Sequence, residues 1–109
     1  MTIPPFKGMW LVVLFDLPVD TRSRRQQYAT FRRALLKDGF IMLQYSVYAR
    51  YCPSEEACQG HAKYVQQAVP PEGEVRLLRI TDHQFGKMEV FCGTRRAPPE
   101  RRPVQSELF

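Results

Sequence analysis

The chain has 109 residues, of which 44% are hydrophobic and 12% aromatic, so it supports one folded domain and is not a disordered protein. Its net charge of +5 favours an acidic partner, with nucleic acid as the first candidate. Three cysteines without a C-x-x-C pair argue against a disulfide framework. No signal-peptide pattern or membrane-length apolar run is seen, so we expect a cytoplasmic protein with no membrane contact.

The most apolar stretch covers residues 9–16 and ends abruptly on the carboxylate of Asp16. Its length and its β-branched and aromatic residues predict a strand that is apolar on both faces. The alternation of a strand places two sets of side chains on opposite faces. These sets are Leu11, Val13 and Phe15 on one face, and Trp10, Val12, Leu14 and Asp16 on the other.

A helix over residues 22–37 follows, because Tyr28, Phe31 and Leu35 recur at helical spacing and Thr21 or Asp20 can cap its start. This segment carries six basic residues and no acid. A solvated helix face usually mixes both signs of charge, so we interpret the segment as a contact for nucleic-acid phosphates. The predicted nucleic-acid residues here are Arg22, Arg24, Arg25, Arg32, Arg33 and Lys37.

The rest of the domain alternates strands and helices. Residues 40–51 predict two strands, or one strand broken near residues 44–46, and a second helix begins after Pro53. The expected apolar stripe of that helix is Ala57, His61, Tyr64, Val65 and Ala68. Strands are expected at residues 74–81 and, as a short last element, at residues 88–92.

Residues 93–109 differ from the preceding domain (1–92) by being basic and proline-rich, which predicts a solvated arm. Arg95 and Arg96 in this arm are expected to lie close to bound DNA. The arm ends in apolar residues, Val104, Leu108 and Phe109, which we expect to dock as a strand on a partner. A frayed terminus is the alternative.

The element order β-α-β-β-α-β, with an extra C-terminal strand, predicts an α+β, ferredoxin-like antiparallel sheet with both helices on one face. The other face, with Trp10, Val12 and Leu14, would then be an uncovered apolar patch. A two-fold homodimer that packs sheet against sheet covers such a patch. It would also bring the two copies of Asp16 near each other.

Asp16 is the candidate catalytic and metal-binding residue. Two copies across a dimer axis could hold one Mg²⁺ at a phosphate, while the alternative is a carboxylate that only bonds to the following turn. No paired acids are evident within the chain. A zinc site made of the cysteines and His61 is disfavoured, because their spacing matches no zinc-finger pattern.

Residues 9–93 together resemble the small subunit of the CRISPR spacer-acquisition complex, the Cas-two family, in its type II branch. The segments that carry the resemblance are Leu14 to Pro18, Arg24-Arg25, Tyr28-x-x-Phe31-Arg32, Asp38 to Tyr48 and Ile80 to Phe91.

This resemblance implies a ferredoxin-like homodimer that sits between two dimers of the CRISPR integrase and holds duplex prespacer DNA. It also implies a metal-dependent endonuclease with Asp16 as the Mg²⁺ ligand, one ion per dimer, and Arg24, Arg25 and Arg33 as phosphate contacts. Whether DNA or RNA is the substrate stays open.

Three other functions fit parts of the sequence. A free-standing endoribonuclease of the toxin type uses the same fold, but leaves the end of the arm unexplained. An RNA-binding module lacks its aromatic signature here, since Lys37 to Phe40 matches it only superficially. A dimeric ligand sensor does not account for the basic helix.

Overall fold

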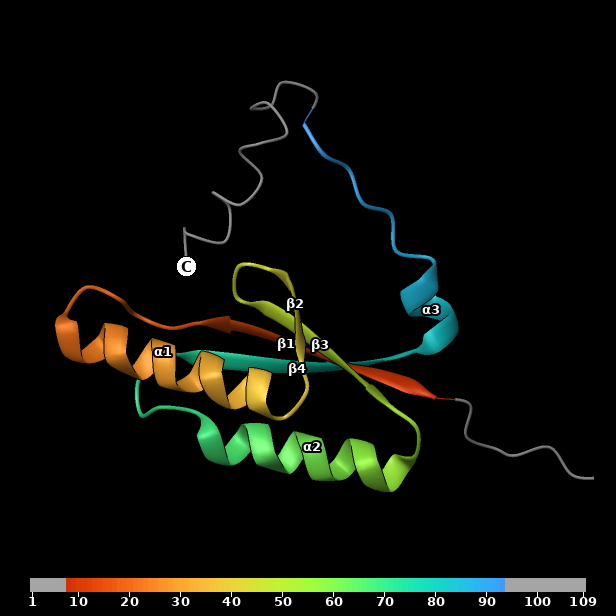
Figure 1. The fold of residues 1–109 in the computed structure, drawn as a ribbon, viewed down its shortest axis with the longest axis horizontal. Helices are drawn as coiled ribbons and strands as arrows, with labels where there is room; N and C mark the ends of the chain where they lie inside the picture. The colour runs from red at the N-terminus through yellow and green to blue at the C-terminus, as the bar shows by residue number, and fades with distance from the viewer. Residues whose placement is uncertain (1–7, 94–109) are drawn as a thin grey trace, which may run out of the picture.

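The computed structural model describes residues 8–93, which form a four-stranded antiparallel sheet with two long helices on one face (Figure 1). β1 (Met9–Asp16) lies inside the sheet, between β3 (Val47–Cys52) and β4 (Glu74–Thr81). β2 (Ile41–Gln44) pairs with β3 and gives the order β2-β3-β1-β4. The ferredoxin-like fold and the two strands predicted within residues 40–51 are confirmed.

α1 (Arg22–Lys37) and α2 (Glu55–Ala68) both lie against the same face of the sheet (Figure 1). The Thr21 hydroxyl caps α1 by accepting a hydrogen bond of 3.1 Å from the backbone of Arg24. Gly39, with a φ of +93°, ends the helix in a backbone conformation that few other residues adopt. The predicted bounds of α1 are therefore confirmed.

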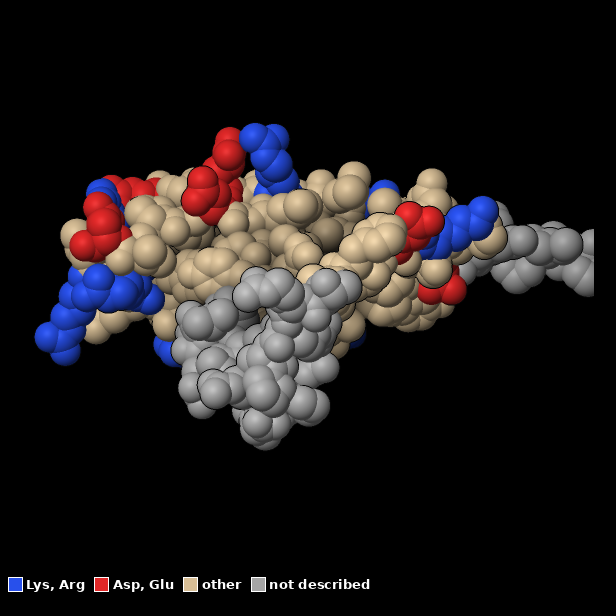
Figure 2. All heavy atoms as spheres, turned by 90° about the horizontal axis from the view of Figure 1, so that it is seen from above, with Lys and Arg blue, Asp and Glu red and all other residues tan. Residues whose placement is uncertain are grey.

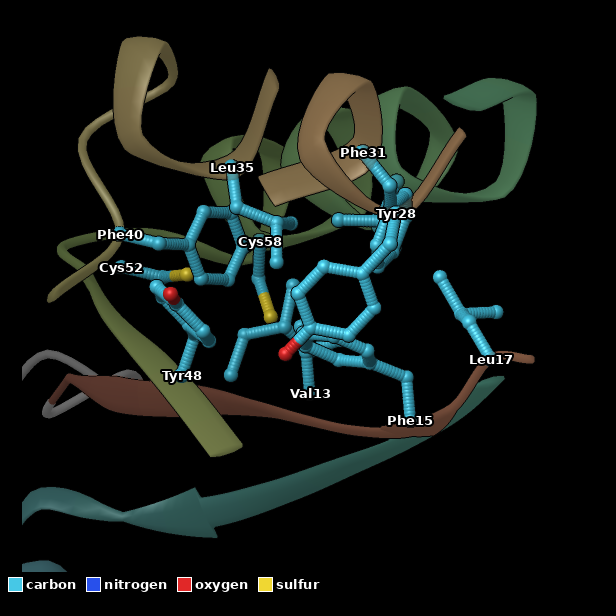
Figure 3. Packing of buried hydrophobic residues seen from close by; sticks show 13 residues of the cluster. Val13, Phe15, Leu17, Tyr28, Phe31, Leu35, Phe40, Tyr48, Cys52 and Cys58 are labelled. Carbon is cyan, nitrogen blue, oxygen red and sulfur yellow. The ribbon is translucent and has the colours of Figure 1, made fainter. Parts of the chain in front are cut away.

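The core fills the space between the sheet and the helices (Figure 3). β1 contributes the alternate residues that its pattern predicts, and these pack against α1 and α2. Phe15 sits among three rings, those of Tyr28, Phe31 and Tyr48, with centroid distances of 5.0 to 5.7 Å. The residues of these three elements that are buried in this core are Leu11, Val13, Phe15, Tyr28, Phe31, Leu35, Cys58, Ala62 and Val65.

Two details of the prediction are wrong. The buried row of α2 consists of Cys58, Ala62 and Val65. Of the stripe that the sequence predicts, only Val65 is buried. The helix is therefore rotated about its axis by about one residue relative to the prediction. The small thiol and methyl groups let α2 approach the sheet closely. His61 and Tyr64 have polar tips, and they flank this row half-buried instead of filling it.

The second error concerns the end of the domain. β4 runs directly into a short helix, α3 (Asp82–Gly86), and residues 87–93 form no strand. A capping box explains the helix, because the Thr81 hydroxyl accepts from the backbone of Gln84 at 3.0 Å while the Gln84 side chain accepts from the backbone of Thr81 at 2.9 Å. The segment beyond α3 leaves Val90 and Phe91 exposed. The boundary at residue 93 stays a prediction, and residues 94–109 lie outside the described part of the chain.

Gly73 fixes the turn beside the carboxyl end of β1. Its φ is +108°, and a Cβ there would collide with the side chain of Leu17 and come within 3.1 Å of the Asp16 carbonyl oxygen. We expect Gly73→Ala to cost about 1–3 kcal/mol of the free energy of unfolding, which lowers the melting temperature by roughly 4 °C or more. Thermal denaturation followed by circular dichroism at one fixed protein concentration measures this.

Gly60 provides the matched control. It lies inside α2 with nothing within 4 Å of an added Cβ, so Gly60→Ala should raise the melting temperature slightly. Equal effects of the two substitutions would contradict the role assigned to Gly73.

Candidate functional site

The face of the sheet opposite α1 and α2 is apolar and largely uncovered. The register of β1 with β4 places Val12 beside Leu78 on this face, and Val12 is buried by its neighbours whereas 52% of Leu78 is exposed. Leu14, Ile41 and Tyr51 are exposed on the same face. Figure 2 looks onto this side, and where the atoms are coloured, its middle is mostly uncharged with charged residues toward the margins. An apolar patch is thus present on the predicted face, but of its three predicted residues only Leu14 is exposed in a single chain.

α3 covers one end of this face, which the sequence did not lead us to expect. The ring of Phe85 stacks on Trp10 with a centroid distance of 3.9 Å and an angle of 9° between the planes. The Trp10 indole nitrogen donates a hydrogen bond of 2.7 Å to the Asp82 carboxylate. Trp10 is therefore half-buried within one chain, and the uncovered patch is centred on Leu14 and Leu78 instead.

Asp16 stands exposed at the carboxyl end of β1, on the apolar face. Its register partner on β4 is Glu74, so two carboxyl groups occupy neighbouring positions on one face. Glu74 forms a 3.3 Å ion pair with Arg76, whereas Asp16 takes part in none of the ion pairs found among residues 8–93. The expectation that the chain has no paired acids is wrong: strand register brings together two acids that are 58 positions apart (74 minus 16).

The donor set at Asp16 and Glu74 suits a hard cation. Mg²⁺ takes oxygen ligands and usually binds one or two protein carboxylates, with water and phosphate oxygens completing its shell. Two adjacent carboxylates repel each other, and a cation between them would remove that repulsion. Within the described residues no group of three or more potential metal ligands occurs, so a cation here would have at most these two carboxylates from one chain.

The basic residues of α1 have different surroundings. Arg24 is held by two carboxylates, with its Nε 2.7 Å from Glu72 and its Nη1 2.9 Å from Asp20, and these contacts hold the pKa of both carboxyls below their usual values. It therefore ties the start of α1 to the turn before β4, and its assignment to a phosphate stays a prediction.

Three of the other bases, Arg22, Arg33 and Lys37, are exposed on the side of α1 that faces away from the core. Arg25 and Arg32 lie nearer the turn between β2 and β3, and with Arg33 they line one hollow beside Tyr45.

His61 belongs to a polar chain outside this region. Arg50 Nε donates to His61 Nε2 at 2.7 Å, and His61 Nδ1 lies 2.7 Å from the Asp38 carboxylate. Because Nε2 accepts a hydrogen bond, Nδ1 carries the proton and donates to Asp38. Both ring nitrogens are thus used in joining β3, α2 and the end of α1, which is a structural role.

Five predicted residues lie outside the described part of the chain. They are Arg95 and Arg96, assigned to nucleic acid, and Val104, Leu108 and Phe109, assigned to partner docking. Among the helices of residues 8–93, none has the length and apolar character needed to cross a membrane.

Comparison with known proteins gives a consistent result. The family model described as CRISPR associated protein Cas2 matches residues 9–88. The chain is 50% identical over 101 residues to the CRISPR-associated endoribonuclease Cas2 of Parvibaculum lavamentivorans, covering 93% of this chain and 100% of that protein. It is 40% identical over 104 residues to the protein of the same name from Flavobacterium psychrophilum, covering 95% and 90%.

A solved structure described as the crystal structure of cas2 matches with a TM-score of 0.57 at 15% identity, over 85% of this chain and 94% of that one, which supports the fold. The family resemblance seen in the sequence is thus confirmed, and the chain belongs to the CRISPR-associated Cas2 family.

Proposed function

We propose that the protein acts in CRISPR spacer acquisition as a two-fold homodimer that binds duplex prespacer DNA and bridges dimers of the integrase. The observation that carries the proposal is the uncovered apolar face that ends in Asp16 and Glu74. An exposed apolar patch on a sheet that lacks helices on that side is typical of an interface. A second copy fits it because a two-fold interface places the same apolar patch on both sides.

The basic side of α1 supports the nucleic-acid part of the proposal. Arg22, Arg33 and Lys37 are exposed, and none of them forms an ion pair within the described residues. Such a row suits the evenly spaced phosphates of a duplex, which bind without regard to sequence. Duplication by the two-fold axis gives two basic rows, as a scaffold that holds one duplex between two integrase dimers requires.

We further propose that the dimer hydrolyses phosphodiester bonds at Asp16. In the dimer, the two copies of Asp16 would share one Mg²⁺, with Glu74 beside each of them. A bound Mg²⁺ polarises the scissile phosphate and lowers the pKa of a water molecule. Asp16 would bind and orient the ion, Glu74 would add negative charge that favours it, and the apolar face around Leu14 would limit the access of bulk water.

An endoribonuclease is the second candidate function. It is favoured by the names of the two relatives described above, both of which are called CRISPR-associated endoribonuclease Cas2. The same carboxylates and the same basic row would serve RNA, since both nucleic acids present phosphates. Incubating the protein and Mg²⁺ with matched DNA and RNA duplexes and single strands distinguishes the substrates.

We expect duplex DNA binding to be insensitive to sequence and steeply dependent on salt. Arg22→Ala combined with Lys37→Ala should flatten the plot of log affinity against log salt by about 0.9 for each phosphate that the variant no longer neutralises. Fluorescence anisotropy with a labelled blunt duplex across a salt series measures the slope.

Lys63→Ala is the control, because Lys63 is an exposed base on α2 and lies outside the proposed surface. An unchanged slope in the double variant, or an equal change in Lys63→Ala, would show that α1 is only a solvated face.

A further inference from the structure

A hollow of about 330 Å³ opens between α1 and the turn that joins β2 to β3. Its volume lies at the lower end of the usual range for small-molecule sites, about 300–1,000 Å³, so it suits one nucleotide and not a duplex. Its lining combines aromatic, apolar and cationic side chains and contains no acid. These residues are Val19, Arg25, Tyr28, Ala29, Arg32, Arg33 and Tyr45.

We propose that this hollow binds one unpaired nucleotide of a nucleic-acid strand, with its base stacked on Tyr45 and its phosphate held by Arg25 and Arg33. The proposal rests on the nucleic-acid function proposed above and adds a second binding mode to it. Duplex DNA would lie along the exposed row of α1, while an unpaired nucleotide would occupy the hollow beside it, and Arg33 would serve both modes.

The aromatic part of the hollow is built in a defined position. Tyr45 exposes 47% of its surface, and its ring stacks on Tyr28 with a centroid distance of 5.5 Å and an angle of 18°. Ser46 holds the turn in place: its carbonyl accepts from Phe15 N at 3.1 Å and its hydroxyl is 3.1 Å from that of Tyr28. An exposed ring backed by a second ring and by a fixed turn is a suitable platform for a base.

Two arginines of the hollow, Arg25 and Arg33, keep N–H groups that can bind a phosphate. Arg25 donates to the Val19 carbonyl at 3.2 Å and Arg33 donates to the Thr30 hydroxyl at 3.3 Å, so each guanidinium is positioned by one bond and keeps further N–H groups. Neither is paired with a carboxylate in the described chain, in contrast to Arg24. Guanidinium groups in this state bind phosphate oxygens well.

Arg32 is a third cation in the lining of the hollow. Its guanidinium lies beside the buried hydroxyl of Tyr48, where burial raises the pKa of the tyrosine and the cation offsets part of that rise. Because its Nε is buried, Arg32 contributes positive charge to the hollow and no hydrogen bond from that atom.

The test uses the full chain and three labelled probes: a short single strand of DNA, an abasic strand of the same length and charge, and a blunt duplex. The wild-type protein should bind the normal single strand more tightly than the abasic strand, because only the former can stack. Tyr45→Leu, which keeps an apolar side chain but removes the ring, should weaken single-strand binding roughly tenfold. Tyr45→Phe should retain it.

Tyr64→Leu on α2 serves as the control, and a thermal melt of each variant establishes that it is folded. Abasic-strand and duplex affinities should be the same in Tyr45→Leu as in the wild type. The proposal is overturned if Tyr45→Leu leaves single-strand affinity unchanged, or if the normal and abasic strands bind equally. Failure of all three probes to bind would instead refute the nucleic-acid function itself.

Discussion

Leu78→Lys is expected to convert the protein from a dimer to a monomer. Leu78 lies on the open face, near the middle of the edge strand β4, and exposes 52% of its surface in a single chain. Burying the exposed half of one Leu78 side chain contributes about 1 kcal/mol to the free energy of dimerisation. A two-fold interface contains two copies of Leu78, so the substitution removes this contribution twice. A loss of about 2 kcal/mol raises the dissociation constant roughly thirtyfold. Burying an uncompensated ammonium group in the interface adds to this effect.

The neighbouring residue provides a matched control for this experiment. Leu77 is the same residue type on the same strand and is 39% exposed, but strand alternation places it on the helix-covered face. Size-exclusion chromatography with light scattering across a dilution series should show that Leu77→Lys dimerises like the wild type. Equal dissociation constants for the Leu78→Lys variant and the wild type would contradict packing through this face.

Asp16→Asn is expected to abolish Mg²⁺-dependent cleavage while leaving the fold intact. The substitution preserves the shape of the side chain but removes its charge. Of the two carboxylates at this end of the sheet, Glu74 is paired with Arg76, whereas Asp16 forms no ion pair within residues 8–93. Removing one stabilising group from a reaction centre typically lowers the rate by about 10²–10³. A chelator should have the same effect on the wild type, measured with end-labelled DNA and RNA under single-turnover conditions.

Two further variants complete the cleavage experiment. Glu74→Gln should reduce the rate less than Asp16→Asn, because Glu74 is already paired with Arg76. Glu56→Gln, at an exposed acid of α2, should have no effect. If Asp16→Asn cleaves at the wild-type rate, the activity resides elsewhere, and the protein would then be a scaffold whose dimer axis carries no chemistry.

Sequence patterns predict the parts of this fold that depend only on the spacing of apolar residues within one strand or one helix. The alternation in residues 9–16 correctly separates the core face of β1 from its open face, because the period of a strand leaves no other arrangement. The helical spacing of Tyr28, Phe31 and Leu35 likewise predicts α1 with the bounds that the structure shows.

The pairing of Asp16 with Glu74 depends on the register of two strands that are distant in sequence, so no local pattern reveals it. The six bases of α1 look equivalent in the sequence, yet the turn before β4 supplies Glu72 to Arg24 alone. The capping box at Thr81 and Gln84 is visible in the sequence as Thr-x-x-Gln. It lies between two segments that the pattern predicts as strands, and for that reason α3 is missed.

Sedimentation equilibrium of the wild-type chain at micromolar concentrations tests the central claim, dimerisation through the open face, most directly. We expect a mass twice the chain mass of 12.8 kDa. The Leu78→Lys variant should sediment as a single chain under the same conditions. A wild-type mass of one chain at every concentration would contradict the shared interface and, with it, the joint magnesium site at Asp16.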